Sequence, residues 1–355
     1  MKKIPALLFT LIFSAGLFAN DKSTSFQTKG KSIEELPFEN TTESISWTDV
    51  YKSGGSELHI IHDGNANSTT CKIIKNGEVI STISNPENPV YSPVTKCVYY
   101  VNRITPSLHA VNIESGKEVS LVDKTLRYPP DEIYLHGTES FALNKTKDKL
   151  FYFGEIWEYD FPVKALESID LRTMEHKKID LGSLRSDFPG YEIYDFGIID
   201  EKNFFIKVYN FHENRTAIVA WYKITDGKPV LKDSIKFTGH YQDEYSFFQA
   251  GNKIIFDAYG MDNADFVLST ESGSIKKETF AGGMIMNTFV YDGTEYFASL
   301  DMEKQYASSY TVAIYERDTM KEVRRKTFKP LNHLWGIVAV GVQDGKILVE
   351  DVICK

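Results

Sequence analysis

Three histidines, His136, His240 and His333, are the residues whose chemistry would be easiest to use for a metal site. Imidazole nitrogens bind transition metals, and three of them could hold one ion. None of the three lies in a short motif with metal-ligand spacing. Asp63–Ser68 begins like a calcium loop, but Ser68 stands where an EF-hand needs Gly, and Ile74 stands where it needs Glu. The sequence therefore predicts neither a metal ligand set nor a cofactor.

Motifs for nucleophilic or phosphate chemistry are also missing from the sequence. The chain contains no Gly-x-Ser-x-Gly elbow, no His-Glu-x-x-His pair and no Walker-type loop. Asp131-Glu132 and Asp243-Glu244 are adjacent pairs whose side chains would point to opposite sides of a strand, so neither pair makes an acid/base dyad by itself. The absence of these motifs does not exclude an active site assembled from distant segments, so an enzyme remains an alternative.

The elements that position these residues start after an N-terminal leader. Met1-Lys2-Lys3 precedes an apolar stretch from Ile4 to Phe13 and the small residues Ser14–Gly16, and Ala19 stands before the polar chain. This order is the pattern of a bacterial secretory signal peptide. The apolar stretch is short for a membrane span, although an uncleaved anchor is the alternative. We therefore expect residues 1–19 to be removed and the mature chain to lie in the periplasm or outside the cell.

Composition and charge limit the classes of partner that the protein can bind. The chain has 355 residues, 42% of them hydrophobic, and a net charge of −9. No basic block is present, so nucleic acid is excluded as a partner. No later window is apolar enough to span a bilayer, and no Cys near residue 19 could carry a lipid. Cys71, Cys97 and Cys354 allow one disulfide or three free thiols, and we expect a monomer.

Beyond residue 45, short β-branched and aromatic runs recur after polar turns. These runs are 58–61, 97–101, 150–153, 204–208, 253–258, 295–300 and 346–352. A second series consists of tight turns, at 30–31, 77–78, 116–117, 174–175, 227–228, 273–274 and 320–321. Both series repeat at about fifty residues, the length of a four-stranded propeller blade. The sequence therefore predicts an all-β fold, a single β-propeller of seven four-stranded blades over residues 20–355.

The two series are out of phase. The first turn, Gly30-Lys31, precedes any early strand, while the last early strand, Lys346–Val352, has no later strands after it. We expect Ser23–Phe38 to form the outer half of a blade and Trp335–Cys354 its inner half, so that pairing of N-terminal with C-terminal strands closes the ring. A pair of β-sandwiches, or a ring of six or eight blades, would share much of this pattern.

The second unit carries a family resemblance. Cys97–Asn102, Leu108–Ile113 and Ser115–Val119 form a strand, a strand, a Gly-Lys turn and a strand. This stretch resembles a YVTN-type propeller repeat, and the chain as a whole resembles secreted bacterial propellers of the broad YVTN or TolB-like kind. The resemblance implies the propeller but no activity, because that group includes binding scaffolds and enzymes.

Residues that lead into the innermost strands of a propeller meet at one mouth of its central channel. Here they are acidic and aromatic, as expected for a protein-binding mouth. The predicted partner-binding residues are Trp47, Tyr91, Glu132, His136, Tyr191, Glu192, Asp243, Glu244, His333 and Trp335. Asp49, Asp131, His240 and Asn287 belong to the same positions. Aromatic residues in the stretch Gly154–Leu166 are a further partner-binding hypothesis.

The sequence thus favours an exported scaffold that holds a protein or peptide partner at one mouth of a propeller, with no catalytic residue assigned. The alternative is a metal-assisted hydrolase or lactonase that holds a divalent metal in the channel. A sugar-binding lectin ranks below both.

Overall fold

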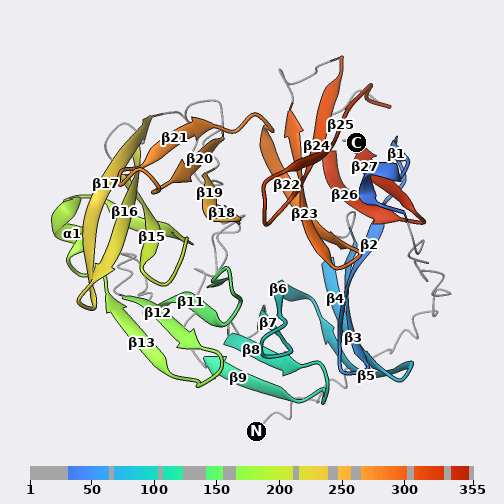
Figure 1. The fold of residues 1–355 in the computed structure, drawn as a ribbon, viewed down its shortest axis with the longest axis horizontal. Coiled ribbons are helices and arrows are strands. Elements are labelled where there is room, and N and C mark those ends of the chain that lie inside the picture. The colour runs from blue at the N-terminus through green and yellow to red at the C-terminus, as the bar shows by residue number, and fades with distance from the viewer. Residues whose placement is uncertain are drawn as a thin grey trace, which may run out of the picture.

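The structure is a computed structural model of the chain, and it describes residues 31–63, 68–102, 107–122, 141–154, 165–210, 216–238, 247–256, 265–301, 308–331 and 337–351. Within these residues the strands form seven sheets arranged around a ring (Figure 1). The fold is a seven-bladed β-propeller, as the repeat predicted. No described helix is long and apolar enough to cross a bilayer.

Six blades have four antiparallel strands each, numbered from the channel outward. Blade 1 holds β2 (Ser46–Ser53), β3 (Ser56–Asp63), β4 (Ser68–Lys75) and β5 (Glu78–Ser84); blade 2 holds β6 (Pro86–Ser92), β7 (Cys97–Asn102), β8 (Ser107–Asn112) and β9 (Glu118–Val122); blade 3 holds β10 (Phe141–Leu143), β11 (Lys149–Gly154), β12 (Ala165–Asp170) and β13 (His176–Asp180). Blade 4 holds β14 (Glu192–Ile198), β15 (Asn203–Asn210), β16 (Thr216–Thr225) and β17 (Lys228–Thr238); blade 5 holds β18 (Phe247–Ala250), β19 (Lys253–Phe256), β20 (Phe266–Ser269) and β21 (Lys276–Thr279); blade 6 holds β22 (Met284–Tyr291), β23 (Thr294–Asp301), β24 (Tyr310–Glu316) and β25 (Glu322–Phe328).

Blade 7 joins the two ends of the chain, as predicted. It contains β26 (Ile337–Gln343), β27 (Lys346–Asp351) and β1 (Phe38–Thr41), and β1 pairs in parallel with β27. The N-terminal strand begins only at Phe38, whereas the sequence placed the outer half of the blade at Ser23–Phe38. Ile33 lies instead in a 3-10 turn, η1 (Ile33–Glu35), and its side chain is buried together with Leu36. The turn predicted at Gly30 lies outside the described residues.

The hydrophobic core lies between the blades. Each blade buries one face against each neighbour, because a sheet arranged radially around the channel lies between two other sheets. Between blades 1 and 2, for example, Leu58 and Ile73 pack with Val98 and Tyr100. Six such clusters follow one another around the ring, and the largest joins blades 6, 7 and 1. A one-turn helix, α1 (Leu184–Asp187), links blades 3 and 4.

The innermost strand of every blade runs in the same direction, which makes the two faces of the ring different. We call the face where these strands begin the loop face, and the face where they end the hairpin face. No connection at the hairpin face has more than six residues. Seven connections at the loop face have eight or more, and the longest of them is residues 123–140, between β9 and β10. Long connections on a rigid frame are where proteins place binding residues.

Candidate functional site: the channel and its two mouths

A cavity of about 860 Å³ follows the axis of the ring. Its wall includes residues from the innermost strands of all seven blades, and it contains both aromatic and polar side chains. The aromatic lining residues are Trp47, Tyr51, Phe196, Phe247, Phe248 and Phe289. Charged lining residues are Asp49, Asp63, Glu87, Lys145, Lys147, Glu295, Arg317 and Asp318. Which of these groups are free to bind a ligand depends on the bonds they already make.

Near the loop face, Trp47, Asp49 and His62 of blade 1 form one cluster. The rings of Trp47 and His62 stack with centroids 4.8 Å apart, and Nε2 of His62 lies 3.1 Å from Oδ2 of Asp49. Oδ1 of Asp49 accepts a hydrogen bond of 2.7 Å from the backbone N–H of Val290 in blade 6. The Asp49 carboxylate therefore ties blade 1 to blade 6 across the inner edge of blade 7.

Other polar side chains of the wall also tie blades together. Asn287 of blade 6 bonds both backbone groups of Val340 in blade 7, with distances of 2.8 Å from Nδ2 to O and 3.0 Å from N to Oδ1. Oδ2 of Asp195 in blade 4 accepts a hydrogen bond of 3.2 Å from the N–H of Phe247 in blade 5. These groups satisfy the backbone at the open inner edges of the sheets, where an unpaired buried group would be costly.

An ion cluster crosses the channel at the hairpin face. The ammonium of Lys147, in the β10–β11 turn of blade 3, contacts the carboxylate of Glu295 in blade 6. Arg317 of blade 6 lies 3.6 Å from the other carboxylate oxygen, and its Nε donates to the carbonyl of Gln249 in blade 5 at 3.1 Å. We call Lys147, Glu295 and Arg317 the clasp. It places charged side chains across the mouth at this face.

The clasp sets the protonation of its members. Burial would raise the pKa of Glu295, but Arg317 and Lys147 outweigh it, and the pKa is lowered from 4.5. Tyr51 lines the same part of the channel, and burial, followed by the charges of Glu295 and Asp49, raises its pKa well above 10.0. Glu295 is therefore ionised and Tyr51 neutral at neutral pH, so the clasp is one anion between two cations, beside an uncharged phenol.

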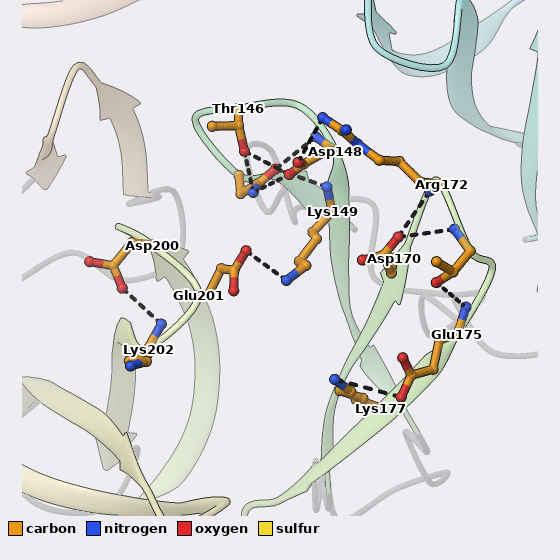
Figure 2. Close-up of polar contacts among 12 residues, drawn as sticks. Thr146, Asp148, Lys149, Asp170, Arg172, Glu175, Lys177, Asp200, Glu201 and Lys202 are labelled. Carbon is orange, nitrogen blue, oxygen red and sulfur yellow. Dashed lines mark hydrogen bonds and ion pairs between the residues drawn. The ribbon is translucent and has the colours of Figure 1, made fainter.

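Turns of blades 3 and 4 at the hairpin face are held by further polar contacts (Figure 2). In the β10–β11 turn, Oδ1 of Asp148 accepts hydrogen bonds from Thr146 and Asn144, at 2.6 and 2.8 Å. These bonds lower the pKa of Asp148. Lys149 reaches Glu201 of blade 4 at 2.6 Å. Hydrogen bonds inside these short turns restrict their conformation, and the polar groups named here already have partners.

Three of the ten predicted partner-binding residues have described side chains. Trp47 lines the channel and is 7% exposed. Tyr91 is buried between blades 1 and 2, where its ring lies 4.8 Å from that of Tyr51, so the structure does not bring it together with Trp47 in the channel. Tyr191 is half-buried beside the core of blades 3 and 4. Glu192 is the first residue of β14 at the loop face.

The remaining predicted residues lie outside the described residues: Glu132, His136, Asp243, Glu244, His333 and Trp335. The predicted aromatic stretch 154–166 lies mostly outside them as well. Among the described residues, no group of three His, Cys, Asp or Glu side chains could hold a metal ion. Cys71 and Cys97 are free thiols, so they do not form a disulfide with each other.

Sequence reasoning missed His62, the clasp and a set of β-bulges. Three innermost strands carry an extra residue near the loop face, at Met286 in β22, Tyr194 in β14 and Val338 in β26. In β6, Asn88 and Pro89 stand opposite the single residue Tyr100, so this strand also carries one extra residue, and both Asn88 and Pro89 line the channel. A bulge re-aims side chains and is common beside binding sites. Pro89 within a predicted strand was the one available signal, because Pro in a strand favours an edge or a bulge.

Comparisons with known proteins find only distant similarity to solved structures. The sequence matches no protein-family model and no curated protein. Among solved structures, the β-propeller domain of the Trilobed protease from Pyrococcus furiosus has a TM-score of 0.41 and 10% identity, covering 84% of this chain and 87% of that one.

Two further structures show the same level of similarity. A Pyrococcus horikoshii acylaminoacyl peptidase has a TM-score of 0.41 and 10% identity over 86% of this chain and 52% of that one. A chain of a nidogen/laminin complex has a TM-score of 0.39 and 11% identity over 87% and 99%. The chain spans about half the length of the peptidase it matches. None of these similarities bears on function, and the propeller is established by its own seven sheets.

Proposed function

We propose that the protein is an exported scaffold that binds a protein or peptide partner at the loop face of the propeller. The observation that carries this proposal is the difference between the two mouths. At the hairpin face the turns are short, polar groups such as Thr146 and Asp148 are bonded to each other, and the ion-paired Lys147, Glu295 and Arg317 line the mouth. At the loop face the channel is lined by Trp47 and Met286, and the long connections begin and end there.

The channel wall supports a partner at the rim more than a small molecule at mid-depth. Asp49, Asn287 and Asp195 already bond the backbone of another blade. A ligand that used these groups would have to break bonds between blades. A partner that covers the loop-face mouth needs none of these groups. It can use aromatic anchors and the acidic residues that precede β10 and β18.

The test is comparative affinity capture from the organism's own cell envelope and culture medium. The tagged protein is compared with a loop-face variant in which Glu132, Glu192, Asp243 and Glu244 are changed to Ala. A matched hairpin-face variant has Glu175, Glu201, Glu271 and Asp318 changed to Ala, which gives the same change in net charge. We expect one stoichiometric protein to be recovered with the wild type and the hairpin-face variant and lost with the loop-face variant. Capture of the same protein by all three, or by none, contradicts the proposal.

Metal content separates this proposal from the hydrolase alternative. A metal-assisted enzyme retains its divalent ion through purification and loses thermal stability when a chelator removes that ion. The proposed scaffold keeps the same unfolding temperature with and without chelator. A stoichiometric metal together with a chelator-dependent unfolding temperature would support the enzyme instead.

A further inference from the structure

The outermost strands of the blades differ in how their open edges are protected. Free strand edges in monomeric proteins are usually guarded by charged residues. Four outer strands follow this rule with two or more Lys or Arg residues each: β13, β17, β21 and β25. The outer strands of blades 1 and 2 have none, and neither does the four-residue outer strand of blade 7, β1. The sequence of β5 is EVISTIS and that of β9 is EVSLV, each with a single charge at its first residue.

The same two strands expose large apolar side chains. Val79 and Ile80 on β5 are 55% and 41% exposed, and Val119 on β9 is 43% exposed. A Cβ on Gly116, in the turn before β9, would lie 3.4 Å from Cδ1 of Ile80, so the side chain of Ile80 reaches the next blade. In Figure 1, β5 and β9 lie next to each other on the outer rim of the ring. We call Val79, Ile80 and Val119 the rim patch.

The register of β5 shows which of its backbone groups point outward. The backbone N–H of Asn85 donates to the carbonyl of Thr69 at 2.9 Å. Bonded and non-bonded pairs alternate along an antiparallel ladder, so Ile83 opposite Cys71 and Ser81 opposite Ile73 also bond inward to β4. The N–H and C=O groups of Thr82 and Ser84 then point away from the blade. Among the described strands, β5 pairs with β4 alone.

We propose that β5 pairs antiparallel with β5 of a second copy of this chain, making a dimer of propellers joined at the rim. Pairing centred on Thr82 places Ile80 opposite Ser84 and Ser81 opposite Ile83. No like charges meet in this register, and the residues include the β-branched types that cross-strand pairs favour. The four lysine- and arginine-rich edges are poor candidates for such self-pairing, because like charges brought together destabilise a strand pair.

The choice of a second copy rests on this self-complementarity. A two-fold interface brings the same surface of both subunits together, so it requires a strand edge that can pair with an identical edge. Val79 and Ile80 would be covered by the partner subunit, which removes an exposed apolar patch from solvent. The dimer leaves both loop faces open. It is therefore independent of the proposed function, and it replaces the monomer expected from sequence.

Sedimentation velocity over a concentration series tests the dimer with three variants of the purified protein. Ile80→Lys places a charge in the pairing, and Thr82→Pro removes an outward N–H that the β4 ladder does not use. Val230→Lys is the matched control, because Val230 is 39% exposed on β17, an edge that already carries lysines. Circular dichroism and thermal unfolding confirm that each variant is folded.

The expected result is a dimer for the wild type and for Val230→Lys. For Ile80→Lys and Thr82→Pro we expect a dissociation constant raised by about tenfold or more. A wild type that stays monomeric over the whole series overturns the proposal. So does a dimer whose dissociation constant is the same in Ile80→Lys as in the wild type, since the contact would then lie elsewhere.

Discussion

The ammonium of Lys147 in blade 3 contacts the carboxylate of Glu295 in blade 6, so one ion pair joins blades that are separated by blades 4 and 5. Most other contacts join neighbouring blades, apart from the bond of Asp49 to Val290 between blades 1 and 6, and the pairing of β1 with β27 closes the ring. A direct bond across the ring gives it a second constraint. The clasp also places charged side chains at the hairpin-face mouth of the channel.

The clasp makes stability depend on the charge of Glu295. We expect Glu295→Gln to lower the free energy of unfolding at neutral pH by about 2–4 kcal/mol, because Lys147 and Arg317 lose a half-enclosed counterion. The matched control is Glu201→Gln. Glu201 is 54% exposed and pairs with Lys149, so this change should cost about 0.5 kcal/mol or less.

The difference in free energy of unfolding between the wild type and Glu295→Gln should depend on pH in one direction. Burial raises the pKa of Glu295, but Arg317 and Lys147 lower it by more, so the folded pKa lies below the ordinary value of 4.5. The stabilisation is thus complete above the unfolded pKa and is lost as the pH falls through the folded value. Denaturant unfolding of both proteins across this range measures it. A gap between wild type and Glu295→Gln that widens in acid would contradict the assignment.

Gly341 in β26 sets the position of Trp47. A Cβ at Gly341 would lie 2.8 Å from Cγ of Trp47, closer than carbon atoms pack. We expect Gly341→Ala to displace the indole, cost about 1–3 kcal/mol of stability and shift the tryptophan fluorescence. In Gly182→Ala the added carbon meets the flexible side chain of Asp180, and little change is expected. Equal stability of the two variants would mean that Trp47 is not held as described.

Asn40 tests the ring closure. Its Nδ2 lies 2.9 Å from Oδ2 of Asp351, 3.0 Å from the carbonyl of Lys329 and 3.2 Å from the hydroxyl of Tyr310. Asn40→Ala removes this amide donor, although Asp351 still accepts hydrogen bonds from the Leu331 N–H and the Tyr310 hydroxyl. We expect a loss of about 1–3 kcal/mol in thermal or denaturant unfolding. Glu39→Ala, on the same strand, removes only a half-exposed pair with Lys346 and should be near neutral. The reverse order would argue against closure through β1.

Cys71 should be unreactive in the folded protein. It is fully buried, and burial raises its pKa to about 12, so almost no thiolate forms at neutral pH. We expect iodoacetamide to leave Cys71 unmodified in the native protein and to alkylate it after denaturation, as peptide mass mapping would detect. Rapid native alkylation of Cys71 would show that the interface between blades 1 and 2 opens.

The repeat was readable from sequence because the turns need particular backbone conformations. Gly77, Gly116, Gly227 and Gly273 adopt positive φ in the last turn of their blades, and Met174 and Met320 adopt it at the same position, with φ of 60° and 58°. The two Met turns were found only because their neighbouring sequences are alike. All seven apolar runs correspond to the second strand of a blade.

The residues of the candidate site were harder to predict from the sequence than the fold, and the physical reason differs from residue to residue. Tyr91 was predicted to face the partner from its place near an innermost strand, but alternation of side chains turns its ring into the core between blades. Glu295 and Lys147 look like ordinary residues of polar turns. Their meeting depends on the curvature of the whole ring, which no local pattern encodes. The bulges shift which residues face the channel and carry almost no sequence signal.

The most direct test of the central proposal is a binding titration with the partner recovered by capture. Isothermal titration would compare its dissociation constant for the wild type with the constants for the loop-face and hairpin-face variants defined above. We predict affinity reduced by about tenfold or more in the loop-face variant and unchanged in the hairpin-face variant. Equal affinity for the wild type and the loop-face variant, or a loss confined to the hairpin-face variant, would contradict a binding surface at the loop face.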